Sequence, residues 1–197
     1  MICEMALILA IDVSGSVLDH HYELQRDATA AAIRERIQPN AHAPIAIQVI
    51  MWGTHHHVVV PWSLLTTHSR INQVAQQLSR TERPEQGFTH MTNLMQFALD
   101  SYAHVPCEAE RMILDISGDG DDTERSVHVQ RDRAQLMQVQ VNGLPIVTEI
   151  QTVDISEYFR SQVVTWDGFV ITADSWHAFH RAIRGKLVLE IAGNAAP

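Results

Sequence analysis

Apolar residues are distributed along this chain in two alternating patterns. Short, mainly apolar runs, such as 5–12 and 111–116, are typical of strands buried on both faces of a sheet. Between such runs the apolar residues recur at helical spacing, as at Phe179, Ile183 and Leu187. The patterns predict strands at 5–12, 44–52, 57–62, 111–116, 144–150 and 169–172, and helices at 19–37, 68–80, 91–104, 124–139, 154–162 and 175–191.

Strands that alternate with helices predict an α/β fold. We expect a doubly wound, mostly parallel six-stranded sheet with helices on both faces. Only Gly53 and a few neighbours separate the strands at 44–52 and 57–62, so these two predict a hairpin and one antiparallel edge strand. The sequence contains no repeat, low-complexity tract or long linker, and we therefore expect residues 1–197 to form a single domain.

Charge and hydropathy narrow the classes of partner. The formal net charge of −9 argues against nonspecific binding to nucleic acid or to an anionic membrane surface. No apolar run approaches the ~20 residues of a membrane-spanning helix, so we expect no membrane insertion. The chain starts almost directly on its first strand, without the basic and apolar regions of a secretory leader, and this start looks trimmed.

Polar residues follow two of the predicted strands and precede one helix. The run D-V-S-G-S at 12–16 follows the first strand, S-G-D-G at 117–120 follows the strand at 111–116, and G-F-T at 87–89 precedes the helix at 91–104. In a doubly wound sheet, ligands bind beyond the carboxyl ends of the strands, where we expect these segments to meet. Their carboxylates and hydroxyls form a hard oxygen donor set suited to Mg²⁺ or Mn²⁺.

These residues resemble the metal-ion-dependent adhesion site of von Willebrand factor A domains. Asp12, Ser14 and Ser16 match its first element, D-x-S-x-S, without a gap. Thr89 and Asp119 match the distant Thr and the distant Asp of that pattern, with Thr92 as the alternative to Thr89. The family usually has Thr-Asp-Gly at the last element, and here Gly118 replaces that Thr.

The resemblance covers nearly the whole chain. Through the runs at 60–62, 113–120 and 182–187, the sequence is most similar to a group of exported bacterial von Willebrand A-like domains of unknown function. The resemblance implies that Ser14, Ser16 and Thr89 contact the metal, while Asp12 and Asp119 act mainly through bound water. The alternative without a metal is that Asp12 and the serines only cap a turn and the following helix.

The implied function is protein binding rather than catalysis. Hydroxyl ligands neutralise little of the cation's charge, so an Asp or Glu carboxylate of a protein partner can complete the coordination of Mg²⁺ or Mn²⁺, with Ca²⁺ as a further candidate. Catalytic metal sites generally need a base or nucleophile beside the metal, and the sequence shows no obvious one. We therefore expect a binding module and not an enzyme.

Two alternative functions stay open. The run G-D-G-D-D at 118–122 also resembles the G-D-G-x-x-D motif of haloacid-dehalogenase-type phosphatases, which begin with an Asp after their first strand, as Asp12 does. Those enzymes usually have a second Asp where this chain has Ser14. They also have a basic residue, usually Lys, ahead of G-D-G, whereas the only lysine here is Lys186, far downstream, and an arginine would have to replace it. The other alternative is a structural domain with a vestigial metal site.

The chain has two cysteines, Cys3 and Cys107, which precede the strands at 5–12 and 111–116 by similar distances. If those strands are parallel neighbours, both cysteines fall at the same edge of the sheet, and a disulfide is geometrically reasonable. Two free thiols are the alternative. A disulfide would favour a periplasmic or secreted location, although a cytoplasmic one stays open.

Three other groups of polar residues each have more than one interpretation. Two of the histidines at 55–57 could share one face of a strand and bind a transition metal, but a solvated hairpin tip is the simpler interpretation. Asp121 and Asp122 border the predicted metal site and are expected in a solvated loop. Asp115 lies inside an apolar strand, so it either orients a site loop or bonds to nearby backbone.

Overall fold

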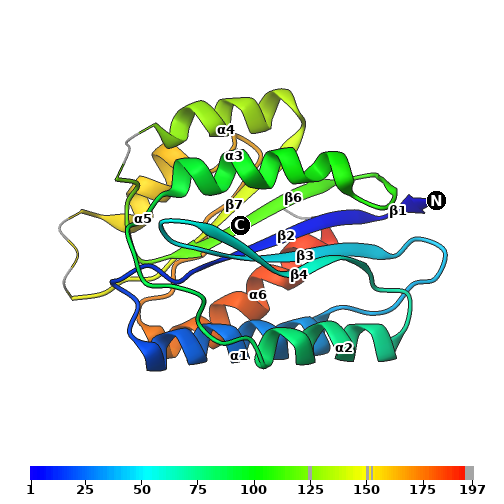
Figure 1. Ribbon diagram of the computed structural model, residues 1–197. Coiled ribbons are helices and arrows are strands. Elements are labelled where there is room, and N and C mark those ends of the chain that lie inside the picture. The colour runs from blue at the N-terminus through cyan, green and yellow to red at the C-terminus, as the bar shows by residue number, and fades with distance from the viewer. Residues whose placement is uncertain (124–125, 150, 152, 194–197) are drawn as a thin grey trace.

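A computed structural model of the chain describes residues 1–123, 126–149, 151 and 153–193. It consists of a central sheet between two layers of helices (Figure 1). Within the described residues, no helix is both long enough and apolar enough to span a bilayer.

The main sheet has five strands in the order β4-β3-β2-β6-β7. Four of them are parallel, and the edge strand β4 pairs antiparallel with β3. This arrangement confirms the predicted α/β fold, its mostly parallel sheet and its hairpin. The strands are β2 (Met5–Asp12), β3 (Ile45–Trp52), β4 (His56–Leu64), β6 (Met112–Gly118) and β7 (Val139–Pro145).

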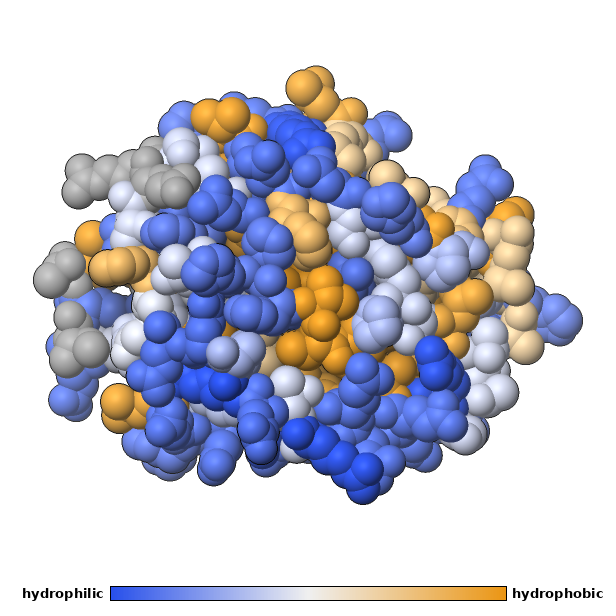
Figure 2. Space-filling model, viewed as in Figure 1, coloured by the Kyte–Doolittle hydropathy of each residue, from blue (hydrophilic) through white to orange (hydrophobic). Residues whose placement is uncertain are grey.

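Each face of the sheet is covered by helices that bury an apolar stripe. On one face the core contains side chains of α1, α2 and α6, and on the other face side chains of α3, α4 and α5. Figure 2 shows apolar side chains in the middle of the face along which the edge strand β4 runs between α3 and α2. The helices are α1 (Asp19–Arg36), α2 (His68–Ser79), α3 (Met91–Ser101), α4 (Val127–Leu136), α5 (Ile155–Tyr158) and α6 (Phe179–Ala192).

The predicted sixth strand is wrong. Residues 169–172 run beside β7 but make only isolated bridges, from Gly143 to Val170 and from Ile146 to Ala173. A regular ladder is interrupted there for two reasons. Pro145 has no N–H to donate, and the side chain of Asn142 accepts the hydrogen bond of the Phe169 N–H at 3.1 Å.

The predicted boundary between the helix at 124–139 and the strand at 144–150 is also wrong. The helix α4 ends at Leu136, and β7 already begins at Val139. Gln138 lies between them with φ of 58°, a left-handed conformation that ends the helix. The sequence predicted the helix from its charged residues and could not reveal this turn. Residues 124, 125 and 150 of the predicted ranges lie outside the described residues.

The other predicted helices are close to the observed ones. A 3₁₀ turn at Tyr102–His104 extends α3, a π turn at Phe159–Val163 extends α5, and a 3₁₀ turn at Trp176–Ala178 precedes α6. These turns account for the ends of the predicted ranges.

The two cysteines form a disulfide. The short strands β1 (Ile2–Cys3) and β5 (Glu108–Ala109) pair in parallel, and Cys3 and Cys107 are bonded with their Cα atoms 5.9 Å apart. The neighbouring strands β2 and β6 are parallel, as the argument for this disulfide required.

Asp115 has a partner that neither sequence interpretation anticipated. Its side chain points from β6 toward α6, where its Oδ1 lies 2.7 Å from the Nζ of Lys186. The same Nζ donates a hydrogen bond of 2.7 Å to the Oε1 of Glu190, one turn further along α6. All three side chains are at most 2% exposed. The only lysine of the chain is therefore held in the core, between two carboxyl groups.

Removing the disulfide tests how much the fold depends on it. The bridge spans 104 residues of sequence, and the chain-entropy model gives about 4–5 kcal/mol for closing so long a loop. We expect the double variant Cys3→Ala and Cys107→Ala to fold, with a free energy of unfolding lower by about 4 kcal/mol in urea titration. An unchanged unfolding midpoint would show that the bridge contributes nothing to stability.

Candidate functional site

The D-x-S-x-S run forms a turn directly beyond the carboxyl end of β2. The Oδ1 of Asp12 accepts a hydrogen bond of 2.7 Å from the backbone N–H of Ser14, which holds the carboxylate inside the turn. Asp12 and Ser14 are buried, whereas Ser16 is exposed. The Oδ2 of Asp12 is buried and has no hydrogen-bond partner among the described residues. A buried oxygen of this kind needs a proton donor, a water or a cation.

Asp119 lies beside this turn because β6 is the neighbour of β2. The register pairs Ile11 with Ser117, which places the residues after both strands side by side. The Oγ of Ser16 donates a hydrogen bond of 2.6 Å to the Oδ1 of Asp119, and the hydroxyls of Ser14 and Ser16 are 3.3 Å apart. The first and last elements of the predicted site therefore meet.

The structure distinguishes Thr89 from Thr92. Thr89 lies next to Gly120, since a Cβ added at Gly120 would be 3.1 Å from the Oγ1 of Thr89. Thr92 is buried, and its hydroxyl bonds to Asp122 at 2.5 Å. Thr89 thus stays available at the edge of the site, beside the residue that follows Asp119.

The expectation that Asp122 lies in a solvated loop is wrong, because its side chain is buried and only 1% exposed. Its carboxylate accepts hydrogen bonds from the N–H and the hydroxyl of Thr92 in the first turn of α3, and from the N–H of Ser126. Asp122 therefore connects the loop after β6 to α3. Asp121 is exposed, as expected.

Three side chains that the sequence analysis missed hold the site loops from outside. The guanidinium of Arg83 donates hydrogen bonds of 2.8 and 2.7 Å to the carbonyls of Val13 and Ser14. Gln25 of α1 donates to the carbonyl of Asp12 at 3.1 Å, and Gln151 donates to the carbonyl of Asp119 at 2.6 Å. All three bond to backbone oxygens, so no sequence motif could have revealed them.

The pKa values of both site carboxyl groups are raised above their usual range. Burial and the nearby charge of Asp119 raise the pKa of Asp12 to about 7, although its hydrogen bonds with Ser14 oppose this shift. Burial also raises the pKa of Asp119, against the opposing bond from Ser16. Two adjacent carboxylates in a dry place are poorly stable alone, and a bound divalent cation would stabilise both.

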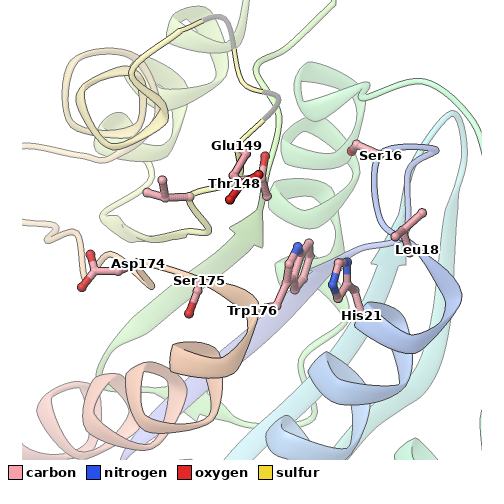
Figure 3. Close-up of a pocket in the computed structure, with 9 residues that line it drawn as sticks. Ser16, Leu18, His21, Thr148, Glu149, Asp174, Ser175 and Trp176 are labelled. Carbon is pink, nitrogen blue, oxygen red and sulfur yellow. The ribbon is translucent and has the colours of Figure 1, made fainter.

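A hollow of about 500 Å³ opens beside Ser16. Figure 3 shows the rings of His21 and Trp176 side by side at its wall, with Leu18 near Ser16 on the loop that leads into α1. The two rings stack, with centroids 4.4 Å apart. Glu149 and Asp174 also line the hollow, so it combines an apolar wall with acidic groups.

The histidines at 55–57 behave differently from one another. His55 pairs with Glu85, its Nδ1 lying 2.8 Å from the Oε2, while His56 stacks on Phe97. Across the described residues, no group of three or more His, Cys, Asp or Glu side chains is arranged to hold a metal ion. The site at Asp12 has only two carboxylates and would rely on hydroxyl ligands.

The sequence matches one family over almost its full length. The model of the family described as "Protein of unknown function (DUF1194)" matches residues 2–195. The chain belongs to this family. No relative was found among curated proteins.

Solved structures with a similar fold include a von Willebrand factor type A protein and a matrix protein with a MIDAS motif. Proximal thread matrix protein 1 of the mussel byssus, in a structure with a zinc-occupied MIDAS motif (metal-ion-dependent adhesion site), has a TM-score of 0.72 at 11% identity over 96% of this chain and 46% of that one. A von Willebrand factor type A protein from Catenulispora acidiphila has a TM-score of 0.71 at 14% identity over 96% of this chain and 43% of that one. The DUF1194 chain therefore spans less than half the length of either.

A third structure matches over its whole length. The conserved hypothetical protein BatB from Bacteroides thetaiotaomicron has a TM-score of 0.65 at 13% identity, over 96% of this chain and 100% of that one. At these identities the likeness shows the fold. The DUF1194 chain thus has the von Willebrand A fold that its D-x-S-x-S run predicted.

The donor set fits a hard divalent cation. Asp12 offers an unpartnered buried oxygen, Asp119 and two serine hydroxyls lie within hydrogen-bond reach of one another, and Thr89 lies at the edge. Gly118 is needed to keep this arrangement, because a Cβ there would be 2.7 Å from the Oδ2 of Asp12. Gly118, which stands where the usual pattern has Thr, therefore leaves room for the Asp12 carboxylate in this structure.

Substitution of Gly118 tests this steric requirement. In Gly118→Ala the new methyl group would displace the Asp12 carboxylate, and we expect a loss of about 1–3 kcal/mol in the free energy of unfolding. Gly185 of α6 is the matched control, because no atom would lie within 4 Å of its added Cβ. We expect Gly185→Ala to gain about 0.5–1 kcal/mol. Equal effects of both variants in urea titration would contradict the steric account.

Proposed function

We propose that this protein is a divalent-cation-dependent protein-binding module, and that a carboxylate of the partner completes the coordination of the cation. The observation that carries the proposal is the buried, unpartnered Oδ2 of Asp12 beside Asp119 and the hydroxyls of Ser14 and Ser16. Ser14, Ser16 and Thr89 would contact the ion, and Asp12 and Asp119 would hold it mainly through water. Mg²⁺ or Mn²⁺ suits this oxygen set.

Binding rather than catalysis follows from the ligand chemistry. Neutral hydroxyls leave the cation electron-poor, so it has a strong tendency to take a further carboxylate. The side chains that reach the site loops from outside, Arg83, Gln25 and Gln151, bond to backbone carbonyls and hold the loops in place. They are not arranged as a base or nucleophile for a reaction.

The surroundings of the site support a protein partner. Leu18 and Phe88 are 53% and 69% exposed, and they lie on the two loops that carry Ser16 and Thr89. Exposed apolar side chains around a polar centre are typical of interaction surfaces. The hollow formed by His21 and Trp176 extends the same surface on one side.

The disulfide supports a periplasmic or secreted location for this binding, since such bonds persist in oxidising compartments. Partners would then be proteins of the cell envelope or the medium that present an accessible Asp or Glu.

The phosphatase alternative gains no support from the site. These enzymes usually have a lysine at the site, and the structure pairs the only lysine, Lys186, with Asp115 and Glu190 in the core. Turnover of an aryl phosphate that Asp12→Asn abolishes would nevertheless establish an enzyme.

Removal of the serine hydroxyls tests the cation site. We expect the double variant Ser14→Ala and Ser16→Ala to lose Mg²⁺ and Mn²⁺ binding in calorimetry. It should still unfold cooperatively, because neither serine belongs to the two apolar core clusters. Ser69→Ala, at an exposed position of α2, is the control and should bind normally. A wild-type chain that takes up no cation would favour a structural domain with a vestigial site.

The loop contacts of Arg83 provide a second test. Residues that orient metal ligands typically change affinity by roughly 10–100-fold when mutated. We expect Arg83→Ala to weaken Mn²⁺ binding within this range, because the carbonyls of Val13 and Ser14 lose their donor. Arg80→Ala removes the same charge from an exposed position and should leave the affinity unchanged. Equal losses in both variants would mean that charge, and not loop geometry, is responsible.

Partner capture tests the function itself. We expect proteins captured from the native organism by the immobilised chain to be released by a chelator, and the double serine variant to capture none of them. Capture that is indifferent to both the chelator and the serines would contradict a cation-dependent interface.

A further inference from the structure

The buried cluster under α6 has the composition of a reactive site. Lys186 carries a nucleophilic amine, Asp115 a carboxyl group, and Glu190 a second carboxyl group that can accept a proton. The cation site uses none of them. Lys186 is fully buried, and Asp115 and Glu190 are each 2% exposed.

The distances place these groups for a reaction. The Nζ of Lys186 lies 2.7 Å from the Oδ1 of Asp115 and 2.7 Å from the Oε1 of Glu190. A carboxyl C–O bond is about 1.23 Å, so the Cγ of Asp115 is at most about 4 Å from Nζ. That limit is close to the ~3–3.5 Å of a near-attack arrangement.

The Asp115 carboxyl group is poorly bonded for an ion in the core. Despite the close Nζ, neither of its oxygens has a hydrogen bond of normal geometry among the described residues. Two carboxyl groups face one amine, so full ionisation would leave an unbalanced negative charge in the core. Burial and the charge of Glu190 raise the pKa of Asp115 to about 7, against the opposing effect of Lys186. At neutral pH the carboxyl group is therefore partly in its neutral, electrophilic form.

Glu190 is held in place to act as the proton acceptor. The amide of Asn142 donates a hydrogen bond of 2.9 Å to its Oε1. The guanidinium of Arg111, just before β6, donates at 2.7 Å to the backbone carbonyl of Glu190. These contacts fix the last turn of α6 against β6 and β7.

We propose that Lys186 and Asp115 condense to an intramolecular isopeptide bond, with Glu190 as the proton acceptor. Glu190 first takes a proton from the ammonium group of Lys186. The freed amine attacks the Cγ of the neutral Asp115 carboxyl group. The carboxyl hydroxyl then leaves as water with a proton from Nζ, and one N–H stays on the amide.

The step balances without any oxidant or co-reactant. It begins with an ammonium, a neutral carboxyl and a carboxylate, and it ends with an amide, a protonated Glu190 and one water. Condensation is unfavourable for free amines and acids in water. Here the fold holds the groups together, and the dry core favours the neutral amide over buried ions. The bond would tie α6 covalently to the middle of the sheet.

Mass spectrometry of the full chain, reduced and unfolded, tests this bond. We expect a mass lower than that of the sequence by one water. Because Lys186 is the only lysine, an amine-reactive label in denaturant should modify the N-terminus and no side chain. After digestion with trypsin, the fragment that begins at Met112 should be joined to the fragment that contains Lys186. A full sequence mass and a labelled Lys186, after long incubation at neutral pH, would overturn the proposal.

Variants assign the roles of the three residues. Lys186→Arg keeps the positive charge and Asp115→Ala removes the carboxyl group, and neither should lose water. Glu190→Gln keeps the shape without the proton acceptor, and we expect the bond to be lost or to form many times more slowly. Circular dichroism checks that each variant is folded, and the mass of the wild-type chain decides the question even if a variant does not fold. Normal bond formation in Glu190→Gln would remove Glu190 from the mechanism.

Discussion

The parallel pairing of β2 with β6 is the constraint on which the site depends. It aligns the ends of two buried strands and so brings the carboxyl groups of Asp12 and Asp119 into one partly dry space. Such a pair is unfavourable when both groups are ionised, and the hydrogen bonds from the surrounding loops oppose this only in part. These loops supply hydroxyls, with Ser16 bonded to Asp119 and Ser14 beside it. A bound divalent cation would resolve this electrostatic problem.

Side chains outside the predicted donor set hold these loops in place. Arg83 and Gln25 bond to backbone carbonyls of the Asp12 turn, and Gln151 bonds to that of Asp119. Asp122 fixes the first turn of α3 through Thr92, so the preceding Thr89 is positioned beside Gly120. These contacts hold the loops and involve none of the side-chain oxygens of the predicted donor set.

The sequence predicted those features that depend on local pattern. Apolar runs predicted β2 and β6, and the spacing of Asp12, Ser14 and Ser16 predicted the von Willebrand A fold. The sequence-based prediction failed where the backbone conformation of one residue, or a contact between distant residues, determines where a strand begins or whether it forms. The left-handed Gln138 moved the start of β7, and Pro145 with Asn142 reduced the sixth strand to isolated bridges.

The same limit applies to the polar residues of the core. A carboxylate in an apolar strand signals that some partner exists, but its identity depends on how α6 docks. Asp115 therefore suggested a site loop or local backbone, whereas its partner is Lys186, from the other end of the sequence. The role of Arg83 was equally invisible, because an arginine in a polar loop carries no pattern that points to distant carbonyls.

The adjacency of the Asp12 turn and Asp119 around one ion is tested most directly by a crystal structure of the chain with Mn²⁺. The account predicts a single anomalous peak at the carboxyl end of β2 and β6. This ion would lie about 2.0–2.2 Å from the hydroxyls of Ser14 and Ser16. A peak at another place, such as the histidines at 55–57, or no peak at saturating Mn²⁺, would contradict it.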